Sequence, residues 1–535
     1  MSSKPKCLTC GDQPLLREGC APCGGTGRRS AAAPAKKRAA APRKRPGLDA
    51  AWPLPVRKIT SSAEAAQTRT GGSWVVPAAD DFDLTDPEEG YPVTGVTGGP
   101  QGGFTLSLPP MPGPFSGPLD ALQRLWGYED FRPGQRQIVE SIAAGEDLLV
   151  VAPTSFGKTV VFQVPAVLRR DAPVVVISPL IALMRDQVGQ ALQRGIPAVA
   201  ITSQYSPDEL RQVYTEAHRA QLIYAAPERL DDPRFRALVE QVRPWLIALD
   251  ELHSVGTEAG LSYRPAYRFV EQMMGRSTHR IQWLGVTASA TPDTVTDVRE
   301  RLRMTNARLI RLSCHRPNLS YGVEILRREE KLRRIYRLIK ENVGQGAAIV
   351  YTLSRKDAEE EVAPFLRAQG LNAVHYHAGM KPPDRRRVEQ QFFGRDVPVV
   401  VSTCAFGMGI DRPDVRLVVM HGMPKSIEDY YQSMGRAGRD QNPARCVALY
   451  DSSRDYSSRR WLIDNGRDLE KNDLTARYGW TDAKFAEAKA QQHALLRSCD
   501  QFLRERTCRV VLLRRYFGEE PGQPCGTCDN CQGEG

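Results

Sequence analysis

Two series of short apolar runs, rich in β-branched residues, alternate with amphipathic segments between positions 119 and 452. Continuous runs of this kind are typical of strands covered on both faces, and so of parallel sheets with helical connections. The sequence therefore predicts an α/β fold with two parallel-sheet domains, at 118–312 and 313–452, and a helical region at 453–535. The runs are 147–152, 173–178, 221–226, 245–250 and 282–287, then 347–352, 372–377, 397–403, 416–421 and 445–450.

The segments before the first run have a different composition. Residues 28–58 hold ten Lys or Arg and one acidic residue, and residues 71–118 are rich in Gly and Pro. Neither stretch has helical or strand periodicity, so 28–117 is predicted to be a disordered linker behind a small cysteine-rich island at 1–27. The basic half could add phosphate contacts or be a plain solvated linker.

The charge balance limits the partners and the location. Lys and Arg number 73 against 62 Asp and Glu, a net charge of +11, which favours a polyanion such as nucleic acid or an anionic surface. A protein with one basic tail has the same balance. No apolar run approaches a membrane span, and the N-terminus has no hydrophobic signal segment. We therefore expect a cytoplasmic protein with no membrane partner.

The segment APTSFGKT (152–159) follows the first predicted strand and precedes a helix start. Backbone N–H groups there, with the helix dipole, can hold a phosphate. Lys158 would contact the β- and γ-phosphates of ATP, and Thr159 would supply a hydroxyl to Mg²⁺. The bland alternative is a strand–helix turn with a chance GKT. The residues predicted to cradle the nucleotide are Thr154, Ser155, Gly157, Lys158 and Thr159.

Two further motifs fit nucleotide hydrolysis. Asp250 and Glu251 end a predicted strand, at the sheet edge where ligands bind in open α/β folds. We expect Asp250 to hold Mg²⁺ and Glu251 to deprotonate the attacking water. Arg436 and Arg439 follow the second series of strands and could neutralise charge on the γ-phosphate. The order of the three motifs predicts a nucleoside triphosphatase motor with ATP between its two domains.

The cysteines form two clusters that read as metal ligands in a reducing compartment. Cys508, Cys525, Cys528 and Cys531 could give a closed tetrahedral Zn²⁺ site. Cys7, Cys10, Cys20 and Cys23 form two CxxC pairs, which suit a small zinc ribbon. A redox pair is the alternative for this N-terminal cluster, although no βαβ pattern surrounds it. Its task, whether it docks DNA, RNA or a protein partner, stays open.

The chain from about 119 to 531 closely resembles RecQ-type DNA helicases of helicase superfamily 2. The resemblance implies two tandem RecA-like domains and a zinc-binding subdomain whose four ligands match Cys508, Cys525, Cys528 and Cys531. The supporting motifs, in family order, are GYEDFRPGQ (127–135), SPLIALMRDQ (178–187), TASAT (287–291), CHRPNLSY (314–321), YHAG (376–379), TCAFGMGID (403–411) and QSMGRAGRD (432–440).

The resemblance also implies roles for single residues. Gln135 would read the adenine edge, with Tyr128 and Arg132 around the base. Gly409 and Asp411 would lie near the nucleotide. The cofactors implied are ATP, Mg²⁺ and Zn²⁺.

Three departures from the family pattern matter. Glu258 stands near the position of a Trp in a loop thought to sense single-stranded DNA. The sequence stops four residues after Cys531, so the winged-helix and helicase-and-RNase-D C-terminal modules of many relatives are expected to be absent. The N-terminal extension is not part of the common core.

The leading functional hypothesis is an ATP-dependent DNA helicase that moves 3′ to 5′, in DNA repair or recombination and associated with the nucleoid. Its partners would be single-stranded DNA and tailed or forked duplexes. One alternative is a DNA-dependent ATPase or translocase that does not unwind by itself. Another is an RNA-directed motor.

Overall fold

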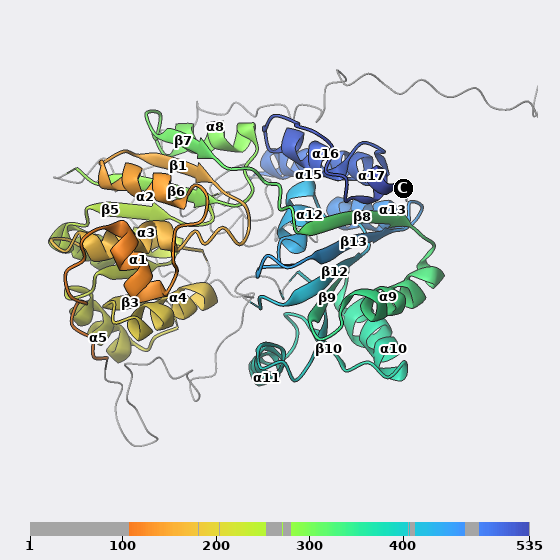
Figure 1. Ribbon diagram of the computed structural model, residues 1–535, viewed down its shortest axis with the longest axis horizontal. Helices are drawn as coiled ribbons and strands as arrows, with labels where there is room; N and C mark the ends of the chain where they lie inside the picture. The colour runs from red at the N-terminus through yellow and green to blue at the C-terminus, as the bar shows by residue number, and fades with distance from the viewer. Residues whose placement is uncertain are drawn as a thin grey trace, which may run out of the picture. The chain divides into compact units, whose positions relative to one another are not determined.

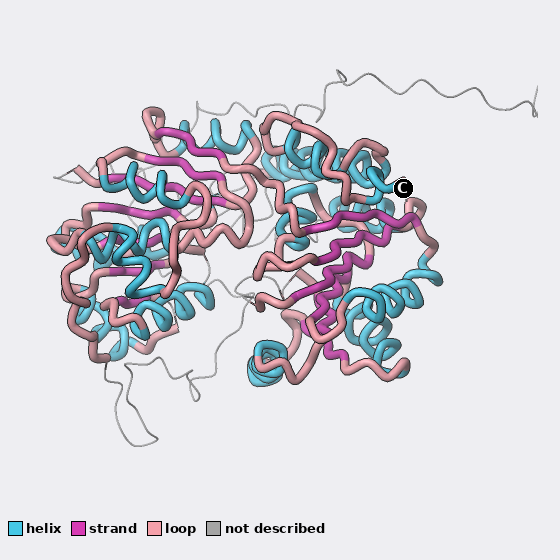
Figure 2. Tube along the Cα trace, in the orientation of Figure 1, coloured by secondary structure: helices cyan, strands magenta, loops and turns pink. Residues whose placement is uncertain are grey.

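The computed structural model describes residues 106–179, 181–202, 204–252, 270, 280–404, 406, 412–465 and 481–533. Within these residues the chain forms two parallel sheets with helices packed on them, and a C-terminal helical region (Figures 1 and 2). This confirms the predicted fold class. The N-terminal linker and the cysteine-rich island lie outside the described residues.

The first domain is built on a sheet of seven described strands in the order β3-β4-β2-β5-β6-β1-β7. The strand pairs are parallel, and β1 lies between β6 and β7. Every residue of β1 to β6 is buried, as expected for strands that helices cover on both faces. The strands are β1 Leu148–Val151, β2 Val174–Ile177, β3 Ala198–Ile201, β4 Leu222–Ala225, β5 Leu246–Leu249, β6 Gln282–Thr287 and β7 Arg308–Arg311.

The helices of this domain begin at recognisable caps. Ser206 and Glu209 form a capping box at α5, and Thr291 caps α8. Four of the helices have a proline in the first turn, where its missing N–H costs nothing. The described elements are α1 Pro118–Trp126, α2 Gln135–Ala143, α3 Val160–Leu168, α4 Ile181–Gln193, α5 Pro207–Ala217, η2 Pro227–Asp231, α6 Pro233–Val242 and α8 Pro292–Arg301.

The second domain has a sheet of six described strands in the order β10-β11-β9-β12-β13-β8, with all of its pairs parallel. The strands are β8 Leu319–Ile325, β9 Ala347–Thr352, β10 Ala373–Tyr376, β11 Val399–Ser402, β12 Val415–His421 and β13 Ala444–Tyr450. The helical elements are α9 Arg328–Asn342, the π-helical η5 Asp357–Val362, α10 Ala363–Ala368, α11 Pro382–Phe393 and α12 Ile427–Met434.

The C-terminal region consists of α13 Asp455–Asp464, α15 Asp482–Arg504, α16 Arg509–Tyr516 and α17 Asp529–Gln532. A buried ion pair holds it to the second sheet. Arg509 Nη2 lies 3.0 Å from Asp529 Oδ2, and the same oxygen accepts a 2.9 Å hydrogen bond from Val323 N in β8. Because both charged side chains are almost fully buried, loss of either would leave the other uncompensated.

Three strands escape the sequence pattern: β3, β7 and β8. All three are edge strands of their sheets. The predicted linker also ends too late, because residues 106–117 pack on the first domain. Leu108 is buried, and Met111 and Phe115 lie against the same core. In the described part of the chain, no helix is both long and apolar enough to cross a bilayer.

Candidate nucleotide site and cysteine cluster

The phosphate-loop residues 152–159 connect the buried strand β1 to the helix α3. The loop needs left-handed backbone at Ser155 (φ 65°) and Gly157 (φ 79°). Glycine adopts this conformation freely, whereas at serine it is strained, as is common at functional sites. The hydroxyls of Thr154 and Ser155 are buried and have no hydrogen-bond partner among the described residues. The loop therefore offers polar groups that a bound phosphate could satisfy.

Lys158 points to the acidic motif. Its Nζ donates to Glu251 Oε1 at 3.0 Å, and both side chains are mostly buried. Burial disfavours the Lys158 ammonium, but Glu251 and Asp250 outweigh it and raise the pKa of Lys158. Burial and the adjacent Glu251 charge raise the pKa of Asp250 to about 6, against the pull of Lys158. Cation and carboxylates thus form one coupled group.

The sheet order explains why these residues meet. β6 lies between β1 and β5, so the segment TASAT (287–291) leaves the sheet between the phosphate loop and Asp250. Ala152 N donates to Thr287 O at 3.0 Å, and Asp250 N donates to Ile177 O at 2.8 Å. Both motifs are therefore fixed to the carboxyl edge of the sheet by main-chain hydrogen bonds.

Two of the three residues expected around adenine, Gln135 and Arg132, are hydrogen-bonded to the same loop. Gln135 is buried, and its Nε2 donates to Phe156 O at 2.7 Å and to Gly157 O at 3.3 Å. Arg132 donates to Ser155 O. Tyr128 is 49% exposed. The sequence did not show that the Gln135 amide holds the phosphate loop.

The end of α12 brings the second domain to this site. Gln432 Nε2 donates to Ser289 Oγ at 2.7 Å, which links QSMGRAGRD to TASAT. A Cβ placed on Gly435 would clash with Thr154 of the phosphate loop. Neither contact was identified from the sequence, because the motifs give no distance between domains.

Arg436 and Arg439 lie close enough to the charged residues of the first domain to interact with them electrostatically. Burial lowers the pKa of Arg436, and Tyr351 and Glu251 oppose that effect. Arg439, in turn, lowers the pKa of Lys158 in opposition to the carboxylates. The Arg436 Nε is buried and makes no hydrogen bond within the described residues. Arg436 and Arg439 therefore interact electrostatically with the group of Lys158, Asp250 and Glu251, while the catalytic roles expected of the five residues stay predictions.

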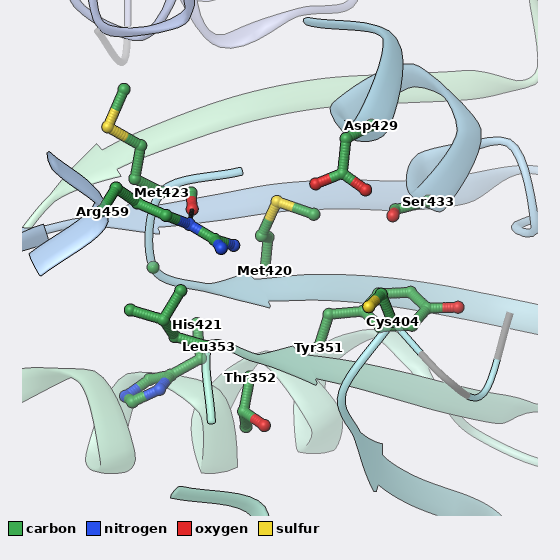
Figure 3. A pocket seen from close by; sticks show the side chains of 11 residues that line it. Tyr351, Thr352, Leu353, Cys404, Met420, His421, Met423, Asp429, Ser433 and Arg459 are labelled. Atoms are coloured by element: carbon green, nitrogen blue, oxygen red, sulfur yellow. Dashed lines mark hydrogen bonds between the residues drawn. The ribbon is translucent and has the colours of Figure 1, made fainter. Parts of the chain in front are cut away.

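A separate small pocket lies at the carboxyl ends of β9 and β12 in the second domain (Figure 3). His421, at the end of β12, is buried there, and neither ring nitrogen has a hydrogen-bond partner among the described residues. Burial, with Lys331 beside it, lowers the pKa of His421 to about 4. The cavity lining is Tyr351, Thr352, Leu353, Cys404, Met420, His421, Gly422, Met423, Asp429, Ser433 and Arg459.

The four C-terminal cysteines converge on one point. Their sulfurs all lie within 4.8 Å of one another, with 3.9 Å between Cys508 and Cys528 and 4.0 Å between Cys525 and Cys531. A tetrahedral site with Zn–S bonds of about 2.3 Å needs sulfurs about 3.8 Å apart. Cys508 precedes α16 and Cys528 precedes α17, so two helix starts fix the cluster. The thiols present fit a zinc ion.

Several predicted residues cannot be placed. Gly409 and Asp411, the N-terminal Cys7, Cys10, Cys20 and Cys23, and Glu258 all lie outside the described residues.

Fold and site define a class of protein with two tandem α/β domains, a phosphate loop on the first and arginines from the second. Three family models match in order: DEAD/DEAH box helicase (residues 132–298), helicase conserved C-terminal domain (330–441) and RecQ zinc-binding (453–532). The chain belongs to the RecQ-type family of superfamily 2 helicases.

The ATP-dependent DNA helicase RecQ of Haemophilus influenzae is 35% identical over 77% of the chain and 63% of its own length. R290 of Acanthamoeba polyphaga mimivirus, named as a candidate ATP-dependent RNA helicase, is 32% identical over 77% of the chain and 71% of its length. The chain thus spans less than two thirds of the RecQ relative.

Among solved structures, the helicase MrfA bound to DNA is similar, with a TM-score of 0.53 and 19% identity. The similarity covers 69% of this chain and 54% of that one, and at this identity it shows the fold alone.

Proposed function

We propose that the protein is an ATP-dependent DNA helicase that moves 3′ to 5′ on single-stranded DNA and acts in DNA repair or recombination. The observation that carries the proposal is the approach of α12 to the phosphate loop, through Gly435 at Thr154 and Gln432 at Ser289. A motor of this class needs arginines of one domain beside the phosphates held by the other. Membership of the RecQ-type family supports the same activity.

In this proposal, Lys158 exchanges partners when ATP binds. Its 3.0 Å ion pair with Glu251 is replaced by contact with the β- and γ-phosphates. Glu251 is thereby released to accept a proton from the attacking water. Thr159 and Asp250 would hold Mg²⁺, which when bound neutralises phosphate charge. The raised pKa of Asp250 fits a buried carboxylate that needs a cation beside it.

Arg436 and Arg439 stabilise the charge that develops on the γ-phosphate. The hydrogen bond between Gln432 and Ser289 joins the second domain to the segment beside the phosphate loop. It would therefore link the position of the two arginines to the phosphates. Opening and closing around this bond would couple hydrolysis to movement along DNA. Gly409 and Asp411 are proposed to complete the second domain's side of the site.

Adenine recognition is assigned to Tyr128, Arg132 and Gln135. The hydrogen bonds of Gln135 to Phe156 O and Gly157 O supply a reason for its use, since they tie base recognition to loop conformation. Gln135 Oε1 accepts a 2.9 Å hydrogen bond from Arg132 N, so both ends of the amide are held next to the loop.

Zinc is proposed at the cysteine cluster, held by Cys508, Cys525, Cys528 and Cys531. A closed site of four thiolates supplies structural stability and no open position for chemistry. A second zinc is proposed at Cys7, Cys10, Cys20 and Cys23 on sequence grounds alone, in an extension that could also dock a protein partner.

The proposed substrates are single-stranded DNA and tailed or forked duplexes. A net charge of +11 suits a polyanion, and the names of several relatives specify DNA. A cytoplasmic, nucleoid-associated location follows from this substrate. Binding held mainly by the DNA backbone should weaken steeply with salt.

One position in the sequence supports a second candidate function. Glu258 stands near the position where the family pattern has a Trp, and a charged residue cannot stack on a DNA base as an indole does. This favours a DNA-dependent translocase that needs a partner for strand separation.

Strand separation on a 3′-tailed duplex, measured with DNA-stimulated ATP hydrolysis on the same preparation, tests the proposal. A 5′-tailed duplex of the same sequence is the matched control for polarity. We expect unwinding of the 3′-tailed duplex alone, with stimulated hydrolysis. Stimulated hydrolysis without unwinding of either duplex would establish the translocase, and hydrolysis stimulated by RNA in place of DNA would contradict both.

A further inference from the structure

Two histidines lie two positions apart at the edge of the second sheet. His375 is in the edge strand β10, and His377 follows the end of the strand by one residue. Alternate residues of a strand project from the same face, and the two rings here are stacked, with centroids 5.6 Å apart and planes 15° apart. The pair thus presents two imidazoles side by side.

Glu359 completes a cluster with these rings. It lies in η5, a π-helical turn that packs against β10, and π-helical turns are frequent at functional sites. Glu359 Oε2 is 3.1 Å from His377 Nε2, and one ligand atom from each of the three side chains lies within 4.8 Å of the others. The cluster therefore joins two separate segments of the domain.

The three side chains differ in burial. The side chain of His377 is 6% exposed and that of Glu359 is 52% exposed, so a buried ligand and a movable one are combined.

An ordinary histidine–carboxylate hydrogen bond explains less of this arrangement. Such a bond needs one ring, as at His493, whose Nε2 lies 2.9 Å from Asp464 Oδ1 with no second imidazole reported in contact among the described residues. At β10 a second ring is stacked on the first, and one of its nitrogens lies within 4.8 Å of the same carboxylate.

We propose that Glu359, His375 and His377 form a binding site for a divalent transition-metal ion, with Zn²⁺ the expected occupant. Bonds of about 2.0–2.2 Å to imidazole and carboxylate place tetrahedral ligand atoms about 3.3 Å apart, so a modest closure of the cluster from its 4.8 Å limit is needed. Two imidazoles favour zinc, cobalt or nickel over magnesium and calcium. Three protein ligands leave a fourth position open to water or to an external ligand.

An ion at this site would fasten η5 to the edge strand β10. Because the ion binds the folded domain and not the unfolded chain, it stabilises the fold by mass action. The site is separate from the nucleotide site and from the cysteine cluster, and its existence does not depend on the proposed helicase activity.

Cobalt titration of the full chain, without a histidine tag and with its tight metal already bound, tests the proposal. A site with nitrogen and oxygen ligands gives visible cobalt bands without the thiolate charge-transfer absorption of cysteine sites. We expect one such ion per chain and a higher melting temperature on binding. His375→Ala and Glu359→Gln alter partly exposed side chains, and each should weaken cobalt binding about tenfold or more.

His493→Ala is the matched control and should bind cobalt as the unaltered chain does. The proposal is overturned if the unaltered chain takes up no cobalt with these bands. It is overturned equally if His375→Ala and Glu359→Gln both bind like the unaltered chain, or if His493→Ala loses the ion to the same extent.

Discussion

The cysteine cluster and the nucleotide site differ in where their residues come from. The cluster uses residues from Cys508 to Cys531, and its thiols already have the separations that one zinc ion needs. The nucleotide site draws on both domains, and its parts are held by substitute contacts such as the Lys158–Glu251 ion pair.

The difference has a physical cause. A structural metal site gains by being closed and rigid, whereas a site that binds and releases ATP must keep polar groups that only the ligand satisfies. The buried hydroxyls of Thr154 and Ser155 and the strained backbone of Ser155 fit the second case. Substitutions should therefore affect stability at the cluster and turnover at the nucleotide site.

The largest effect on stability is expected for Cys528→Ser. Loss of one thiolate ligand should release one zinc ion per chain and unfold the C-terminal region, since zinc binding and folding are coupled at such sites. Zinc content and thermal melting measure this. Cys446→Ser, at a buried cysteine that is not in the cluster, is the control and should keep its zinc. If Cys528→Ser kept its full zinc content, the four cysteines would not be the zinc ligands.

Lys158→Ala should reduce ATP hydrolysis about 100- to 1,000-fold, in line with removal of one stabilising donor from a transition state. The zinc content should not change, which separates this site from the cluster. Lys356→Ala removes an exposed lysine with a carboxylate neighbour, Glu360 at 3.7 Å, and should hydrolyse ATP normally. Steady-state turnover of both variants is the measurement, and normal turnover in Lys158→Ala would rule out the phosphate-loop assignment.

His421 adds a third case, a buried group without a polar partner in the second domain. Its pKa is about 4 in the folded chain against 6.5 as the ordinary value. The unfolded chain therefore takes up a proton first, and the free energy of unfolding should fall between pH 6.5 and 4, by up to about 3 kcal/mol. Denaturant unfolding measures the free energy of unfolding at pH 7 and at pH 5. Its decrease between the two pH values should be smaller for His421→Gln than for the unaltered chain. An equal decrease would show that His421 does not have the lowered pKa.

The smallest effect is expected for Gly435→Ala. Gly435 has ordinary helical backbone (φ −63°), so the backbone tolerates alanine, and the nearest atoms to the new methyl group are those of Thr154 in the other domain. Overpacking of this kind costs about 1–3 kcal/mol and should slow ATP hydrolysis without lowering the melting temperature. Gly189→Ala in α4, where the methyl group meets open space, is the matched control. Equal turnover in the two variants would show that the two domains do not approach at this point.

The sequence predicted ten strands: the nine inner strands, whose β-branched runs are covered on both faces, and the edge strand β10. It missed the other three edge strands, β3, β7 and β8, for reasons that differ. β7 begins and ends with arginine, and one face of it is not covered. β8 carries Ser320, Gly322 and Glu324 between its apolar residues, and β3 is built half of alanine. β7 and β8 lack the continuous burial that makes inner strands recognisable, whereas β3 is fully buried and is missed because of its alanines.

The sequence motifs predicted which residues form the nucleotide site, but not the hydrogen bonds that connect them. The bonds of Gln135 to the phosphate loop and of Gln432 to Ser289 depend on side-chain geometry that spacing does not specify. The His375–His377–Glu359 cluster likewise needs η5 to pack on β10. The C-terminal cysteine cluster was easier to predict, because Cys525, Cys528 and Cys531 are close together in the sequence and their thiols are therefore close in space.

The central claim is that catalysis needs an arginine of the second domain beside phosphates held by the first. Arg436→Ala tests it most directly, through ATP binding and ATP hydrolysis measured on the same DNA-saturated protein. The account predicts that nucleotide affinity stays within a few-fold while turnover falls about 1,000-fold or more, as for loss of an arginine finger. Turnover equal to that of the unaltered chain would contradict the two-domain site.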